Sequence, residues 1–97
     1  MFNIVIEPRA LEDIQAGIDY YDNIKIGLGE LFYNIVNEYI EAISINPFYQ
    51  IRYKDYRALP ISKFPYIIFF YLDESIKTAY IISIFNTNQN PNNYPFH

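Results

Sequence analysis

A helical repeat of apolar residues from Leu28 to Ile43 is the clearest periodic segment of this 97-residue chain. A repeat at spacings of three and four places its apolar side chains on one stripe of a helix, which must pack against another element. Asn46-Pro47 ends the helix, because the residue before a proline avoids the helical backbone region. The repeat consists of Leu28, Leu31, Phe32, Ile35, Val36, Tyr39, Ile40 and Ile43.

A shorter helix and a strand are predicted ahead of this repeat. Phe2, Ile4 and Ile6 alternate with other residues, and a period of two is typical of a strand. Pro8 suits the first helical turn, where its missing N–H costs nothing. With a short connector at 22–27, the two helices form an αα-hairpin. The apolar stripe of the first helix is Leu11, Ile14, Ile18 and Tyr21, and its expected solvated face carries Glu12, Asp13, Asp19 and Asp22.

The chain after Pro47 changes from a helical to an extended pattern. Its apolar runs are rich in β-branched and aromatic residues, which favour strands. Strands are predicted at 50–53, 56–59, 66–72 and 78–85, with turns at 60–65 and 73–75. The order β-α-α-β-β-β over residues 1–97 predicts one α+β domain. The domain has an N-terminal strand, and an αα-hairpin packs on one face of its mostly antiparallel sheet.

The predicted strand 66–72 is apolar on both of its faces. Tyr66, Ile68, Phe70 and Leu72 alternate with Ile67, Phe69 and Tyr71. A helix layer covers only one face of a sheet, so the other face is either exposed as a partner site or covered by loops and the C-terminal tail. An uncovered face predicts a chain that is poorly soluble or dimeric on its own.

Charge and composition exclude several functions. The formal net charge is −4, which does not favour nucleic acid, although four of the seven bases fall between Arg52 and Lys63. No cysteine is present, and no His, Asp or Glu cluster has metal-ligand spacing, so we expect no metal and no cofactor. We see no signal peptide, and the longest apolar run is too short to span a bilayer.

Motifs spread along the chain form a recognisable set. The helices carry Ala10, Asp13, Ile14, Tyr20, Tyr21, Leu28, Gly29, Phe32, Val36, Ile40, Asn46 and Pro47. The strands carry Arg57, Leu59, Phe64, Pro65 and Tyr66, followed by the final strand and its exit, "ISIFNTNQNPNNY". In the order and spacing of these motifs, nearly the whole chain resembles the RelE/ParE toxin superfamily of bacterial type II toxin–antitoxin systems, and the ParE-type, plasmid-stabilisation branch most.

The resemblance implies a small cytoplasmic toxin that either cleaves mRNA on the ribosome or poisons DNA gyrase. It also implies a cognate antitoxin as partner, which neutralises the toxin, in a toxin–antitoxin hetero-oligomer; a homodimer is the other assembly considered. The residues expected to contact the target or the antitoxin are Arg52, Arg57, Tyr66, Phe69, Tyr71, Asn86, Gln89 and Tyr94.

Ribonuclease activity would need a base, an acid and cations around a phosphate. The candidates are Arg57, Lys54 and Tyr94, with Arg57 alternatively a structural residue paired with an acid such as Asp55 or Glu7. Asn86 and Gln89 stand where the family often has a histidine and a basic residue, and neither amide transfers protons. His97, the last residue, is expected to be a chain end or part of a tag.

Three hypotheses follow from the sequence. The first is a ParE-like toxin that inhibits gyrase without being an enzyme, and the missing proton-transfer groups favour it. The second is an mRNA interferase of the RelE type. The third is a relative without toxicity that only binds an antitoxin.

Overall fold

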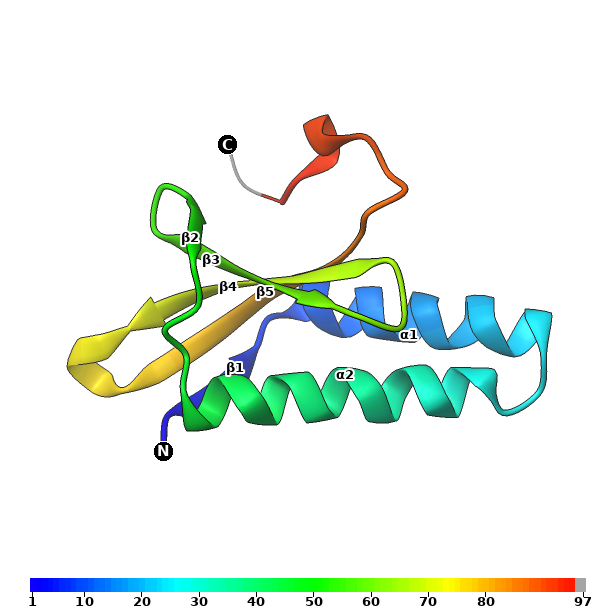
Figure 1. The fold of residues 1–97 in the computed structure, drawn as a ribbon, viewed down its shortest axis with the longest axis horizontal. Helices are drawn as coiled ribbons and strands as arrows, with labels where there is room; N and C mark the ends of the chain where they lie inside the picture. The colour runs from blue at the N-terminus through cyan, green and yellow to red at the C-terminus, as the bar shows by residue number, and fades with distance from the viewer. Residues whose placement is uncertain (96–97) are drawn as a thin grey trace.

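A computed structural model describes residues 1–95 of the chain, and His97 lies outside them. The strand–helix–helix–strand order of the prediction is present (Figure 1). The helices are α1 (Pro8–Ile24) and α2 (Leu28–Ile45). The strands are β1 (Asn3–Ile6), β2 (Ile51–Tyr53), β3 (Tyr56–Ile61), β4 (Tyr66–Asp73) and β5 (Thr78–Asn86), and two short 3-10 turns are η1 (Glu74–Ile76) and η2 (Pro91–Asn93).

The strands form one five-stranded sheet in the order β1-β5-β4-β3-β2. β1 pairs in parallel with β5, and every other neighbouring pair is antiparallel. Both helices lie on one face of this sheet (Figure 1). The predicted α+β class, with an αα-hairpin on one face of a mostly antiparallel sheet, is therefore confirmed.

The main core lies between the helices and the sheet. At its centre Tyr21 of α1, Phe32 of α2 and Phe64 before β4 meet with ring centroids 4.7–5.3 Å apart. The stripe of α1 is set differently from the prediction, because Ala10 is buried while Leu11 is exposed. The buried side of α1 is Ala10, Ile14, Gly17 and Tyr21. Two of these residues are small, so a search for large apolar side chains at helical spacing does not find them.

The opposite face of the sheet is covered in part by the C-terminal tail, defined here as residues 87–95. The tail leaves β5 and turns over the sheet on the side away from the helices (Figure 1). There Tyr94 packs on a small second core made of Ala58, Phe69 and Phe85. The tail covers this face at Phe69, which is buried, and leaves it open at Tyr71, which is 37% exposed.

Two predicted turns differ from the structure. β3 continues through Pro60 and Ile61, although a turn was predicted from residue 60. Proline lacks the N–H that a central strand donates, but β2 pairs only with Tyr56 and Arg57, so β3 is an edge strand at Pro60. The turn at 73–75 is the 3-10 turn η1, in which the Asp73 side chain accepts a hydrogen bond from the Ser75 N–H at 3.1 Å.

Neither helix in the described part of the chain has the length and apolar character needed to cross a membrane.

Candidate functional site

Asp13 links α1 to the middle of the sheet. Its Oδ2 atom accepts hydrogen bonds from the Ser83 hydroxyl at 2.8 Å and from the Ile84 backbone N–H at 3.1 Å. Ser83 is buried, so this carboxylate satisfies a hydroxyl that has no access to water. The prediction that Asp13 lies on a solvated helix face is therefore wrong.

Asp22, placed on the same solvated face by the sequence, also has a structural contact. Its Oδ1 atom accepts a hydrogen bond from the Gly29 N–H at 2.9 Å. Gly29 is in the first turn of α2, where backbone N–H groups lack partners within the helix. Asp22 therefore joins the end of α1 to the start of α2.

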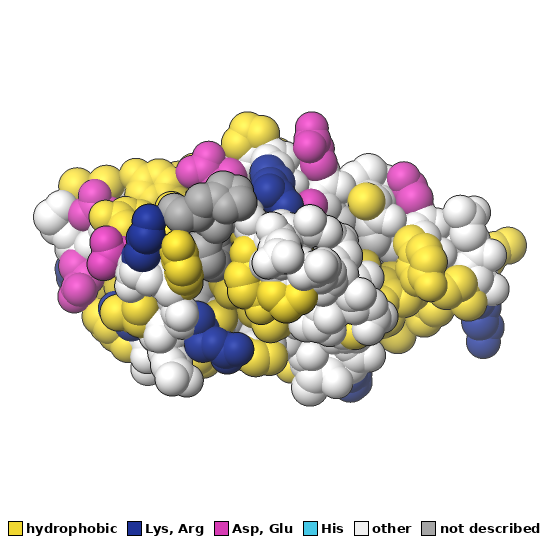
Figure 2. Space-filling model, turned by 90° about the horizontal axis from the view of Figure 1, so that it is seen from above, with side chains coloured by type: hydrophobic (Ala, Val, Ile, Leu, Met, Phe, Trp, Pro, Cys, Tyr) yellow, Lys and Arg dark blue, Asp and Glu magenta, His cyan; other side chains and the backbone are white. Residues whose placement is uncertain are grey.

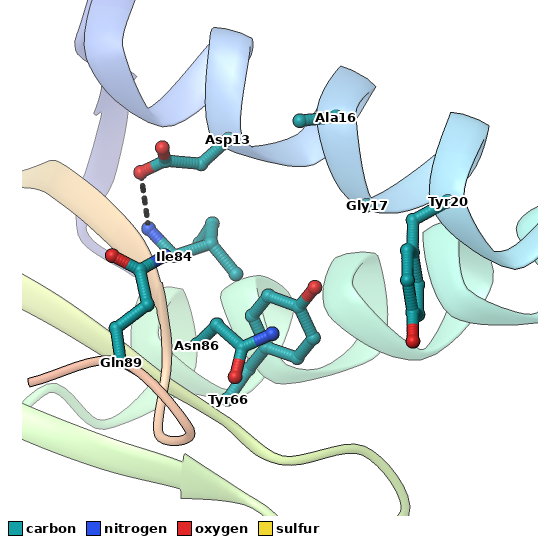
Figure 3. Close-up of a pocket in the computed structure, with 8 residues that line it drawn as sticks. All are labelled: Asp13, Ala16, Gly17, Tyr20, Tyr66, Ile84, Asn86 and Gln89. Atoms are coloured by element: carbon teal, nitrogen blue, oxygen red, sulfur yellow. Dashed lines mark hydrogen bonds between the residues drawn. The ribbon is translucent and has the colours of Figure 1, made fainter.

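A pocket of about 180 Å³ opens between α1 and the beginning of the tail (Figure 3). Its α1 side presents positions 13, 16, 17 and 20, which share one face of a helix because they are three or four residues apart. The side chain of Gln89 reaches from the tail toward Asp13 (Figure 3). The lining residues are Asp13, Ala16, Gly17, Tyr20, Tyr66, Ile84, Asn86 and Gln89.

Asparagines at the end of β5 and in the tail have a structural role. The Asn86 side chain accepts a hydrogen bond from the Asn88 N–H at 2.8 Å, and Asn90 accepts one from the Asn92 N–H at 2.9 Å. A hydrogen bond from the N–H of a residue to the side chain two positions before it forms a local turn. These turns fix the path of the tail. Thr87 adds two hydrogen bonds to the Pro65 carbonyl, through its N–H at 2.7 Å and its hydroxyl at 3.1 Å.

These turns bring Tyr94 onto the sheet. Its ring centroid lies 5.1 Å from that of Phe69 and 4.9 Å from that of Phe85. Phe69 is 2% exposed as a result, so a partner can reach it only if the tail moves.

Arg57 lies on the other face of the sheet from Tyr94. It pairs with Phe70, which belongs to the main core, whereas its neighbour Ala58 belongs to the second core under Tyr94. Its guanidinium donates a hydrogen bond to the Tyr49 carbonyl at 2.8 Å and lies 5.6 Å from the centroid of the Phe48 ring. The structure therefore does not bring the expected catalytic pair Arg57 and Tyr94 together.

The remaining predicted contact residues are dispersed. Arg52 and Lys54 are exposed around the β2–β3 turn, where Lys54 has a left-handed backbone (φ 49°) and its ammonium lies 5.4 Å from the Tyr53 ring centroid. Tyr66 is buried in the main core and lines the pocket beside Asp13, whereas Tyr71 is on the opposite face.

Tyr71 is the middle ring of a row across three strands. The centroid of its ring is 6.3 Å from that of Tyr56 on β3 and 6.4 Å from that of Tyr80 on β5. These three rings, with Glu7 and Ile82, line a shallow hollow of about 340 Å³ on the tail side of the sheet.

Charges on this side are dispersed (Figure 2). Lys and Arg side chains stand apart from one another, with Asp and Glu side chains among them. A protein that holds a nucleic acid strand presents a continuous basic surface to its phosphates, and this view shows none.

Two tyrosines have pKa values that are shifted by their surroundings. Burial, together with neighbouring Tyr66 and Tyr20, raises the pKa of Tyr21 from 10.0 to about 12. Hydrogen bonds with Ser62 lower the pKa of Tyr39, whose hydroxyl lies 2.9 Å from the Ser62 hydroxyl. Tyr39 is on α2 and Ser62 precedes β4, so this contact fastens the strand connection to the helix.

Within residues 1–95, no group of three or more His, Cys, Asp or Glu side chains is placed to hold a metal ion.

Solved structures with a similar fold come from bacterial toxin–antitoxin systems. A chain of the intact E. coli RelBE toxin–antitoxin complex aligns with a TM-score of 0.68 at 12% identity, covering 89% of this chain and 96% of that one. A chain of the chromosomal ParDE system of P. aeruginosa aligns with a TM-score of 0.66 at 18% identity, covering 89% and 96%. The isolated E. coli RelE toxin aligns with a TM-score of 0.68 at 10% identity, covering 94% and 89%.

The sequence comparisons give no match, either with a protein-family profile or with a curated protein. The likeness is therefore one of structure, and at these identities it establishes the fold alone. The chain has the fold of the RelE and ParE toxins, as its sequence motifs predicted.

Proposed function

We propose that this protein is the toxin of a bacterial type II toxin–antitoxin system, acting in the cytoplasm and held inactive by a cognate antitoxin. The observation that carries the proposal is the fold, which aligns with chains from RelBE and ParDE systems over 89% of this chain. Fold alone does not define activity, so the choice between targets depends on the residues at the surface.

The arrangement of these residues favours a toxin that binds its target without chemistry, in the manner of a ParE-type gyrase inhibitor. Arg57 and Tyr94, the best candidates for phosphate binding and proton transfer, are on opposite faces of the sheet. Asn86 and Gln89 offer amides, which cannot serve as general acids or bases. A toxin that only binds its target needs no proton-transfer group. The separation of Arg57 from Tyr94 therefore does not weaken the proposal of a gyrase inhibitor.

The antitoxin is proposed to be a segment that orders on the toxin when it binds. Two described surfaces could receive it: the pocket beside Asp13 and the tyrosine hollow around Tyr71. Both are concave and combine aromatic rings with one carboxylate, which is the mixture that a peptide with apolar and basic side chains would match.

The decisive experiment expresses the chain under one promoter and the antitoxin candidate under another. Expression of the chain alone should stop growth with signs of DNA damage, and the purified protein should reduce supercoiling by gyrase. Arg57→Lys is a useful internal control, because it keeps the charge on a side chain that we assign to the fold and should leave toxicity unchanged.

Two other results would reject the gyrase proposal. Cleavage of ribosome-bound mRNA by the purified chain, abolished in Tyr94→Phe, would identify an mRNA interferase of the RelE type. Normal growth together with tight antitoxin binding would identify a relative that has lost toxicity.

A further inference from the structure

The pocket between α1 and the tail contains the Asp13 carboxylate, which can accept further hydrogen bonds. Both structural hydrogen bonds to Asp13 end on Oδ2, and Oδ1 takes part in neither of them. A carboxylate has about four lone-pair sites and can accept a bidentate partner. Asp13 can therefore hold α1 on the sheet and bind a further donor at the same time.

The lining of this pocket favours a cation. Among the described residues that line it, Asp13 is the only charged one. The amide oxygen of Gln89 offers another acceptor, and its side chain extends toward Asp13 (Figure 3). A phosphate or a carboxylate would meet the negative charge of Asp13, and no Lys or Arg is among the described lining residues to balance it. Arg9 stands one turn before Asp13 on α1 but is not part of the lining. The lining therefore disfavours an anion and suits a group with several N–H donors.

The shape of the pocket favours a long side chain with a planar end. Ala16 and Gly17 leave the surface of α1 low between Asp13 and Tyr20, two positions about 10 Å apart along the helix axis. The aliphatic stem of arginine can lie over this low surface beside the rings of Tyr20 and Tyr66, with its guanidinium at Asp13. Lysine would bring one compact charge, and arginine brings five donors in a fixed fork.

We propose that this pocket is a receptor for an arginine side chain, presented by a peptide segment of the partner protein. The segment is assigned to an antitoxin, and that assignment rests on the proposed function. A side chain is favoured over free arginine because the described lining offers no cation to hold the α-carboxylate of a free amino acid. The binding of the guanidinium itself does not depend on which protein supplies it.

The test is a titration of the 15N-labelled full chain with Nα-acetyl-arginine N-methylamide, followed through the backbone amides of Ile84 and Gln89. The matched control ligand is the citrulline analogue, which has the same length and shape but no charge. Loss of a charge-assisted hydrogen bond should weaken binding by about tenfold for the citrulline analogue. Equal affinity of the two ligands would overturn the proposal.

Two variants of the chain separate charge from fold. Asp13→Asn keeps an oxygen that can accept from Ser83 and Ile84 but removes the charge, so it should weaken arginine binding by about tenfold. Ser83→Ala keeps the charge and should bind within about twofold of the original, since it loses only a hydrogen bond behind the pocket. Unchanged binding by Asp13→Asn would contradict the proposed role of Asp13.

The source of the arginine is tested with unmodified L-arginine. If the pocket receives a side chain, the blocked analogue should bind at least as tightly as the free amino acid. Tighter binding of free L-arginine would overturn the peptide assignment and identify a small-molecule site. These binding measurements are independent of the growth assay. If arginine does not bind, the toxin proposal still stands. If expression of the chain does not stop growth, the arginine-binding result still stands.

Discussion

Gly17 determines how closely the two helices approach each other. A Cβ atom at this position would lie 2.4 Å from Cε2 and 2.6 Å from Cζ of Phe32. Phe32 is fully buried at the centre of the main core, so its ring has no free space into which it can move.

Gly17→Ala should therefore destabilise the fold despite the better helix propensity of alanine. Overpacking costs about 1–3 kcal/mol, and the propensity gain of about 1 kcal/mol offsets part of it. We expect a net loss of up to about 2 kcal/mol in the free energy of unfolding, measured by urea denaturation.

The control for this prediction is the same change made together with Phe32→Leu. The smaller side chain removes the clash, so Gly17→Ala should cost less in that background than in the original chain. Equal costs in the two backgrounds would mean that contact with Phe32 is not the cause.

Tyr21 should make stability sensitive to strongly alkaline pH. Its pKa is raised to about 12 in the fold, whereas an unfolded chain loses this proton near pH 10. Below pH 10 the phenol is neutral in both states, so its contribution is complete there. Between about pH 10 and 12 the unfolded state gains stability by ionising, and the free energy of unfolding should fall.

The measurement is urea denaturation at several pH values from 8 to 11.5, compared with Tyr21→Phe. The variant has no proton to lose at this position, so its stability should decline less steeply above pH 10. Parallel curves for the two proteins would contradict the role given to Tyr21, because the other tyrosines titrate in both.

At the scale of elements, the periodicity of the apolar residues predicted most of the helices and strands. The stripe of α2 and the apolar runs of β4 and β5 fixed the type of each element, because burial on one face imposes a period. Pro60 was misread because a proline usually marks a turn, and only the short length of β2 makes it acceptable in β3. The tail has no period, so its path across the sheet could not be predicted.

The candidate site was harder to predict for a related reason. Alternation along β3 indicates that Arg57 and Ala58 face opposite sides, but it does not say which side the helices cover. The importance of Asp13 was also hidden, since its partners Ser83 and Ile84 lie 70 and 71 residues away in the chain. The pocket had one local signal in the sequence: positions 13, 16, 17 and 20 share a helix face, and two of them are the small residues Ala16 and Gly17.

The tail should act as a cover for the second core. Tyr94→Ala removes the ring that packs on Phe69 and Phe85, so both become accessible to solvent. We expect stronger fluorescence of a hydrophobic dye and a loss of about 1–2 kcal/mol in the free energy of unfolding. Tyr94→Phe keeps the ring and is the matched control. Dye binding that is unchanged in Tyr94→Ala would show that the tail does not protect this face.

At the scale of the whole molecule, apolar side chains remain exposed around the tyrosine hollow and on the helices. Tyr71, Tyr20 and Leu31 are 37%, 58% and 46% exposed. Scattered exposure of this kind is ordinary in a monomer, but a hollow lined by three tyrosines marks a place where a partner can bind.

The chain purified alone should therefore be poorly soluble or dimeric, and an antitoxin expressed with it should correct this. Size-exclusion chromatography with light scattering gives the mass of the particle in each case. A soluble monomer that does not bind a hydrophobic dye would contradict the partner reading of this face.

The position of β5 also determines when the protein can fold during synthesis. β5 begins at residue 78, yet it lies inside the sheet between β1 and β4 and receives the Asp13 contacts of α1. Until β5 has left the ribosome, β1 has no strand to pair with, and Asp13 of α1 has no hydrogen-bond partner on the sheet. Pairing of such distant segments is slow and exposes unfolded chain to the cell. A nascent chain stopped before residue 78 would therefore be a substrate for proteases and chaperones rather than an active protein.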